Sequence, residues 1–337
     1  MKRSRTILQL LLGILIALAA LWLTYRSIDL AGLLDVLRNA HWAALALVLP
    51  PLALSYVFRT LRWQVLLSPI RRTSFGEAMP PLLVGFMVNS LLPARVGELV
   101  RALLLSRRIG ISRASSLGTV FLARTFDGLT LTAMTLLAMA SLWGLLDRGV
   151  RTGLVAASAG YIVVLLCAVA LRKWKRRAAD AFVWPFRKGG MGHLADRAER
   201  MMLSFADGLD TLSSWREVVQ ISLLSLGVWL SLALSVAPAF LALRLPMQWH
   251  YPVLVLILAA FGMLIPTPAG TGTVHATLRF VLPAVTVLTA AQAAALALVF
   301  HASQFIPIIV AGIIAAVREG VRPKDVVDQA EDLDRYT

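Results

Sequence analysis

Long apolar runs, separated by short basic segments, make up most of the chain. A transmembrane helix needs about 20 mostly apolar residues, because about 30 Å of hydrocarbon is crossed at about 1.5 Å per residue. Runs of roughly this length occur at Ile7–Thr24, Trp42–Phe58, Ala114–Leu146, Gly153–Leu171, Val218–Leu243 and Ala290–Val317. The pattern predicts an all-α polytopic membrane protein with about six transmembrane helices.

Two further apolar stretches, Pro80–Ser106 and Tyr251–Leu282, are interrupted by polar or helix-breaking residues. The interruptions are Asn89, Pro93, Arg95, Gly97 and Glu98 in the first stretch, and Pro266, Pro268, Gly270 and Gly272 in the second. Each stretch divides into two helical pieces of about 10–15 residues, too short to cross the hydrocarbon core. Irregular backbone at membrane depth is tolerated only where protein or water satisfies its polar groups. We therefore predict that both stretches are re-entrant helical hairpins.

The basic residues fit this topology. The chain has 33 Lys and Arg against 18 Asp and Glu, a formal net charge of +15. Cytoplasmic loops are enriched in Lys and Arg. If both hairpins return to the side they leave, most basic residues and both termini fall in the cytoplasm. The order span, hairpin, span then occurs twice in opposite orientations, at about 42–146 and about 218–317, which predicts an inverted repeat.

The chain is predicted to form a single integral membrane domain over residues 1–317, followed by a cytoplasmic tail at 318–337. The segment at about 193–215 has apolar residues at helical spacing, which indicates a helix on the cytoplasmic lipid surface. Met1–Ala20 resembles a signal peptide, but further spans follow it, so it is interpreted as a retained first span. Because 58% of the residues are hydrophobic and 15% charged, the basic excess is expected to face anionic lipid and not nucleic acid.

The first interruption carries the densest group of charges in an apolar setting. Arg95, Glu98 and Arg101 are spaced three residues apart, which predicts one shared helix face. Charges within a membrane normally face a partner or a water-filled cavity. Glu98 and Arg101 could pair with each other, but Arg95 would then remain. A helix N-terminus favours anions, so Arg95, Arg101 and the neighbouring Asn89 are predicted to bind a phosphate group.

Other charges lie in the second and third spans. Arg124 and Asp127 are one turn apart and form either a self-contained ion pair or an arrangement in which Asp127 turns Arg124 toward the same cavity. Arg59, Arg62 and Trp63 end the second span and are interpreted as interfacial anchors in preference to ligands.

The second interruption is rich in proline, glycine and threonine. Gly270 and Gly272 allow backbone to approach a neighbour or a ligand closely. Thr271 and Thr273 are candidate caps of the following half-helix, whose N-terminus again faces inward. His275 is either a packing residue or a proton-coupling group.

Motifs of soluble catalytic sites are absent from the sequence. It has no Walker loop, no H-E-x-x-H pair, no dinucleotide fingerprint and no nucleophile elbow. The single cysteine, Cys167, excludes a disulfide framework within the chain and a cysteine-rich metal site. No enzymatic activity, cofactor or metal is therefore expected.

The motifs Asn89…Pro93-Ala94-Arg95-Val96-Gly97-Glu98…Arg101, Arg124…Asp127 and Pro266…Pro268-Ala269-Gly270-Thr271-Gly272 resemble the flippase-like membrane domain of lysylphosphatidylglycerol synthases. The resemblance runs from about Trp42 to Val317. It implies lipid translocation between leaflets, with a charged headgroup passing through a cavity lined by the two hairpins. The soluble aminoacyl-transferase domain of the full synthase is missing from this sequence, so synthase activity is not expected. His275 stands where the family usually has an acidic residue, and His301 lies near a frequent arginine.

The predicted function is translocation of an anionic phospholipid or polyprenyl-phosphate-linked lipid across a bacterial inner membrane. A non-transporting partner that holds a lipid precursor for a separate transferase is the alternative, and a membrane-embedded transferase using Glu98 or Asp127 as base is a third. Under each hypothesis, the expected protein partner is a second copy of this chain or a lipid-modifying transferase. The predicted substrate-binding residues are Asn89, Arg95, Arg101, Arg124, Gly270, Thr271, Gly272 and His275, with Glu98 and Asp127 as charge partners.

Overall fold

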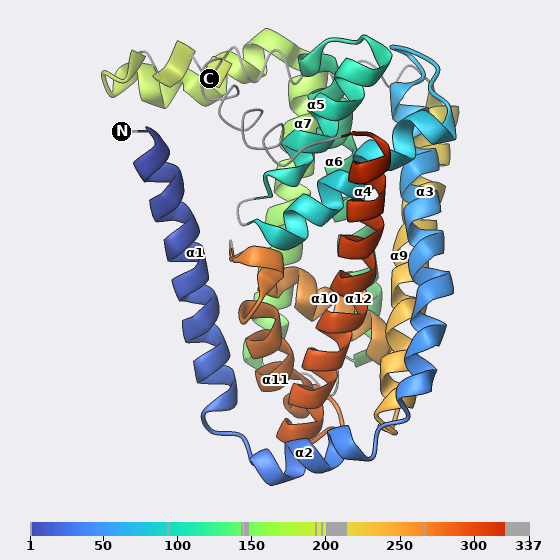
Figure 1. Ribbon diagram of the computed structural model, residues 1–337. Coiled ribbons are helices and arrows are strands. Elements are labelled where there is room, and N and C mark those ends of the chain that lie inside the picture. Colours follow the sequence, from blue (N-terminus) through green and yellow to red (C-terminus); the bar gives the residue numbers. More distant parts are fainter. Residues whose placement is uncertain are drawn as a thin grey trace.

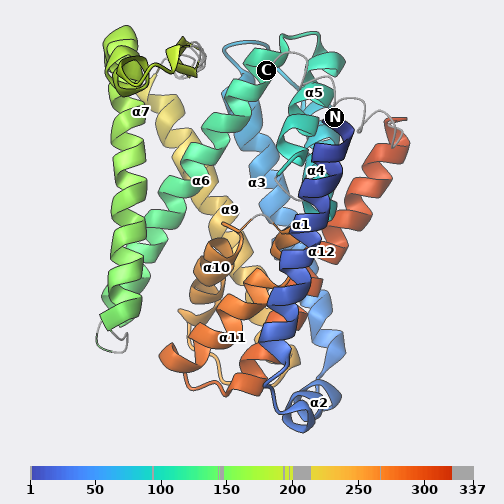
Figure 2. The same cartoon turned by 90° about the vertical axis from the view of Figure 1, so that its left-hand side faces the viewer.

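The computed structural model (Figures 1 and 2) describes residues 2–92, 95–142, 144, 148–192, 194–196, 198–199, 214–265 and 267–320. Every regular element in these residues is a helix, which confirms the predicted all-α class. Most of the predicted interfacial helix at 193–215, nearly all of the tail, and the prolines at 93 and 266 lie outside the described residues.

Four described segments are long and apolar enough to cross a membrane. They are η1 (Trp42–Val48) with α3 (Leu49–Leu67), most of α6 (Arg113–Leu142), α9 (Trp215–Ala242) and α12 (Ala290–Arg318). They correspond to four of the six predicted spans. α1 (Lys2–Tyr25) and the short helix α2 (Leu30–Arg38) meet at 94° and together provide a fifth candidate.

α7 (Arg148–Lys188) covers the remaining predicted span, Gly153–Leu171, and consists of two helical parts joined at a kink. Its first part runs past Leu171 into the basic residues that follow. The kink is at Lys175, whose φ of 27° and ψ of −98° are not helical. After the kink its last part runs across one end of the bundle (Figure 1).

Both interrupted stretches are broken where proline and glycine predicted a break. The first consists of α4 (Phe75–Leu91) and α5 (Gly97–Ile109). The second consists of α10 (Tyr251–Gly262), the short helix η2 (Pro268–Gly270) and α11 (Thr273–Val285). The two views show α4 and α5 in one half of the bundle and α10 and α11 in the other (Figures 1 and 2).

Within each broken stretch, the two helices touch backbone to backbone at a glycine. A Cβ atom on Gly97 would collide with the carbonyl oxygen of Gly85 in α4, and one on Gly85 would lie 2.6 Å from the Cβ of Arg101. In the other half, a Cβ on Gly262 would lie 2.7 Å from the Cα of Val274. Small residues are used in this way at helix interfaces in membranes, where dispersion contacts drive association.

Each half has its own apolar core. Trp63, Leu82, Leu105 and Leu122 belong to a core formed by α3, α4, α5 and α6. A larger core contains residues of α9, α10, α11 and α12, among them Phe240, Tyr251, Leu278 and Leu296. α4 contacts both α12 and η2, so it connects the two halves.

Candidate functional site

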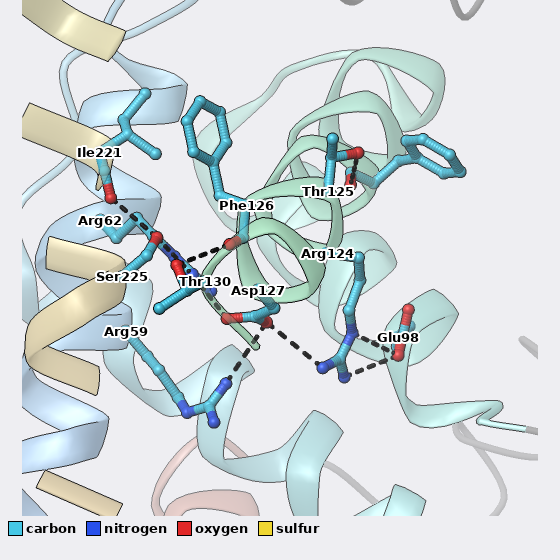
Figure 3. Close-up of polar contacts among 11 residues, drawn as sticks. Arg59, Arg62, Glu98, Arg124, Thr125, Phe126, Asp127, Thr130, Ile221 and Ser225 are labelled. Atoms are coloured by element: carbon cyan, nitrogen blue, oxygen red, sulfur yellow. Dashed lines mark hydrogen bonds and ion pairs between the residues drawn. The ribbon is translucent and has the colours of Figure 1, made fainter. Parts of the chain in front are cut away.

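Asp127, in α6, is the centre of a buried network of charges (Figure 3). One carboxylate oxygen accepts a hydrogen bond of 2.6 Å from Nη1 of Arg62, which also donates to the Ser225 hydroxyl of α9 at 2.9 Å. The other oxygen lies 3.7 Å from Nη1 of Arg59 and 3.5 Å from Nη1 of Arg124. A single carboxylate thus links α3, α6 and, through Arg62, α9.

Arg124 extends the network from α6 to α5. Its Nε and Nη2 both approach Oε1 of Glu98, at 2.7 and 2.6 Å. Glu98 therefore pairs with Arg124, and the alternative pairing of Glu98 with Arg101 is wrong. The predicted pairing of Arg124 with Asp127 is present, but Asp127 is shared with two further arginines.

Arg101 has no carboxylate partner among the described residues. Its guanidinium lies over two aromatic rings instead, 5.4 Å from the centre of Trp63 and 5.6 Å from that of Phe86. Phe86, in α4, also receives the guanidinium groups of Arg59 at 4.8 Å and Arg124 at 5.7 Å. Three cations thus lie within about 6 Å of the centre of one aromatic ring, whose faces attract positive charge. Arg59, Arg62, Arg101 and Arg124 are called the arginine cluster below.

The prediction that Arg59 and Arg62 are interfacial anchors was wrong. Their residues are only 8% and 2% exposed, because α3 continues to Leu67 and packs both arginines inside the protein. The sequence contained one indication of this burial. Arg59 and Arg62 are three residues apart, which puts both on one helix face.

Arg95 does not share a helix face with Glu98 and Arg101, contrary to the prediction. α5 begins only at Gly97, and Arg95 precedes it with a left-handed φ of 56°. Its side chain is exposed, and its carbonyl accepts the Glu98 N–H at 3.1 Å. Arg95 therefore lies at the open edge of the site, while Arg101 lies inside.

Asn89 has a structural role in the broken segment. Its Oδ1 accepts the N–H of Gly97 at 2.8 Å and so caps the first turn of α5. Losing such a cap costs about 1 kcal/mol. We expect Asn89→Ala to lower the free energy of unfolding by about that amount, as thermal unfolding would show. Affinity for the phosphate-bearing lipid that the sequence predicts should stay nearly unchanged in a lipid titration. A large loss of affinity without a loss of stability would instead make Asn89 a ligand.

The second break forms a separate polar region. Gly270 and Gly272 have φ of 70° and 82°, which only glycine adopts at low cost. A Cβ on Gly272 would lie 2.9 Å from the Cβ of Ala20, so this glycine allows close approach to α1. Within the described residues, no hydrogen bond or ion pair joins this region to the arginine cluster.

Threonine caps at the start of α11 are not observed. The cap position is Gly272, whose N–H donates to Nδ1 of His275 at 3.3 Å. The Thr273 hydroxyl donates to the carbonyl of Gly270 at 3.0 Å, and Thr271 donates its backbone N–H to Pro268 at 2.8 Å.

His275 is buried and stacks on His301 of α12, with ring centres 4.8 Å apart. Tyr25 of α1 meets His275 edge to face at 6.1 Å. Nε2 of His275, Nδ1 of His301 and the Tyr25 hydroxyl are buried without a hydrogen-bond partner among the described residues. This geometry supports the interpretation of His275 as a packing residue. It leaves these three polar atoms without a hydrogen bond in the described residues.

A hollow of about 350 Å³ lies between α1 and α11. It is lined largely by apolar side chains, namely Ile16, Ala19, Ala20, Leu23, Ile265 and Phe280, together with Thr273, Ala276 and Thr277.

The site thus combines buried arginines with a broken helical segment inside a bundle of apolar helices. A model of the transmembrane region of lysylphosphatidylglycerol synthase matches residues 10–312. The chain belongs to this family. Membership and the four or five apolar spans make it a multi-pass membrane protein, and the resemblance noted in the sequence is confirmed.

This family member is also similar to a larger protein, the glycosyltransferase AglD of Haloferax volcanii. The two are 24% identical over 355 residues, covering 95% of this chain and 56% of AglD. The chain thus spans little more than half the length of that curated relative.

Proposed function

We propose that this protein translocates a phosphate-bearing lipid between the leaflets of a bacterial inner membrane, without catalysing a covalent reaction. The observation that carries the proposal is the arginine cluster, buried among α3, α4, α5 and α6 of a membrane protein. Buried charges in membranes mark substrate pathways in general, and arginine binds phosphate with paired donors.

The proposed topology has six spans and two re-entrant hairpins, with both termini in the cytoplasm. α4 and α5 form the first hairpin, and α10 and α11 the second. Their positions in opposite halves of the bundle support an inverted repeat (Figures 1 and 2). In such repeats the substrate site lies where the broken helices meet, and rocking of one repeat against the other exposes it to each side in turn.

In this mechanism Arg101 and Arg124 bind the lipid phosphate, and Arg59 and Arg62 reinforce the positive field behind them. Asp127 and Glu98 hold the arginines in position (Figure 3). Arg95, exposed beside the cluster, makes the first contact with an entering headgroup. Gly270, Thr271 and Gly272 line the opposite half of the path, where His275 packs against His301. The hollow between α1 and α11 accommodates part of an acyl chain.

The test is lipid exchange between leaflets in proteoliposomes, measured by dithionite quenching of fluorescent phosphatidic acid and phosphatidylglycerol. We expect Arg101→Gln to slow exchange at least about tenfold, equivalent to about 1.4 kcal/mol of lost stabilisation. Arg108→Gln is the matched control, because Arg108 lies at the other end of α5 and pairs with Glu319. Equal rates in parent, Arg101→Gln and protein-free vesicles would refute the proposal.

The similarity to AglD favours a second candidate, a membrane partner that holds a lipid precursor for a transferase. That protein is named a glycosyltransferase and is nearly twice as long as the matched region. If the protein only holds a lipid precursor, we expect tight lipid binding with no leaflet exchange in the same proteoliposomes. Function should then be recovered only when the transferase is present.

A further inference from the structure

The charges of the arginine cluster do not balance. Three of its four guanidinium groups contact two carboxylates, Asp127 and Glu98, while Arg101 lies over aromatic rings. Four positive charges against two negative charges leave two positive charges in excess. Arginine stays protonated in proteins, so the excess cannot be removed by loss of a proton. Uncompensated charge away from water is costly.

Within the described residues, no other acidic side chain pairs with the arginine cluster. Between Trp42 and Leu142 the only further acidic residue is Glu77. It lies in the first turn of α4, where its carboxylate accepts the backbone N–H of Ser74 at 2.7 Å. From Val218 to Arg318 the sequence contains no Asp or Glu at all. The balancing anion must therefore come from outside these segments.

The buried arginines also have unused donors. Arg59, Arg62 and Arg101 are each more than nine-tenths buried, and the Nε of each has no hydrogen-bond partner in the described part of the chain. Arg101 has no ion pair there either. Glu98 and Arg124, in contrast, are partly exposed, as is the neighbouring Arg95. The cluster is thus open on the side of Arg95, and among the described residues Asp127 is its one buried carboxylate.

We infer that this site selects a lipid headgroup with a phosphate group carrying about two negative charges, a phosphomonoester or a diphosphate, over a singly charged phosphodiester. A phosphodiester carries one negative charge and neutralises only half of the excess positive charge. A phosphomonoester carries nearly two negative charges near neutral pH. Charge-assisted bonds to each added oxygen increase the difference. The inference rests on the proposed function and specifies its substrate class.

The test compares lipids that differ only in the headgroup. Protein in nanodiscs is titrated at pH 8 with dioleoyl phosphatidic acid, dioleoyl phosphatidylglycerol and dioleoyl phosphatidylcholine, and binding is measured by native mass spectrometry. We expect phosphatidic acid to bind at least about tenfold more tightly than phosphatidylglycerol, which is about 1.4 kcal/mol. Arg101→Gln should bring the ratio close to one, and Arg108→Gln should leave it unchanged.

Thermal unfolding separates a binding role from a structural one. Arg101→Gln removes an unpaired buried charge, so the empty variant should be at least as stable as the parent, yet should lose the stabilisation that phosphatidic acid provides. Arg59→Gln repeats the measurement at a second position, where the nearest carboxylate oxygen is 3.7 Å away. Lower stability of both empty variants, with unchanged stabilisation by the lipid, would overturn the inference.

Each remaining outcome has a distinct meaning. Equal affinity for phosphatidic acid and phosphatidylglycerol, reduced in Arg101→Gln, would overturn the charge selectivity and leave the translocator intact. Failure of the parent to bind any of the three lipids would overturn both. Soluble pyrophosphate is added as a competitor. Displacement of the lipid at concentrations near the lipid's own Kd would identify a free phosphate compound as the occupant and overturn the lipid assignment.

Discussion

Asp127→Asn should destabilise the protein by about 3–5 kcal/mol, the largest effect expected for a single change in the arginine cluster. Asp127 is 6% exposed and is the only carboxylate within reach of Arg59 and Arg62 among the described residues. Without its charge, the four guanidinium groups of the arginine cluster are offset by Glu98 alone. The measurement is unfolding by SDS in mixed micelles, followed by circular dichroism.

A double-mutant cycle identifies the cause of this loss. Combining Asp127→Asn with Arg62→Gln removes both members of the 2.6 Å pair, so the double variant should be more stable than the sum of the two single changes implies. Asp35→Asn is the control, because Asp35 lies on the exposed face of α2 and should change stability by less than about 0.5 kcal/mol. Additive losses would show that Asp127 and Arg62 contribute independently.

The helices were predictable wherever length and hydropathy determine them. The spans at α6, α9 and α12 agree with the structure within a few residues, because a run of about 20 apolar side chains has few alternatives in a membrane. The two breaks were predictable from proline and glycine. The extension of α7 beyond its apolar part could not be predicted, because the basic residues there are compatible with either a loop or a helix on the surface.

The partners of the charged residues could not be predicted from the sequence. Spacing by three residues indicates contact only within one helix, and Arg95 lies before the helix that contains Glu98 and Arg101. The partner of Glu98 is Arg124, 26 residues later. Arg62 reaches Asp127 from 65 residues away, a contact that depends on how α3 packs against α6. Tertiary packing therefore decides which charges meet, while the sequence indicates only that several must.

Glycine at position 97 determines whether the site can form, and Gly97→Ala should abolish leaflet exchange. A Cβ there would collide with the Gly85 carbonyl oxygen and lie 2.7 Å from Oδ1 of Asn89. These atoms belong to backbone or to the cap of α5, so they can yield only if α4 and α5 separate. Overpacking of this kind costs about 1–3 kcal/mol or more. It also moves Glu98 and Arg101 away from Arg124 and Phe86, which α6 and α4 hold.

Gly76→Ala, in α4, the helix that Gly97 packs against, is the matched control for this prediction. A Cβ on Gly76 meets nothing within 4 Å, so the alanine should stabilise the helix by up to about 1 kcal/mol and leave exchange unchanged. The pair of variants is compared in the dithionite assay and by thermal unfolding. If Gly97→Ala exchanges lipid as fast as Gly76→Ala, close contact of α4 and α5 is not required for transport. Loss of exchange in Gly97→Ala alone would show that the backbone contact between α4 and α5 holds Arg101 where a phosphate can reach it.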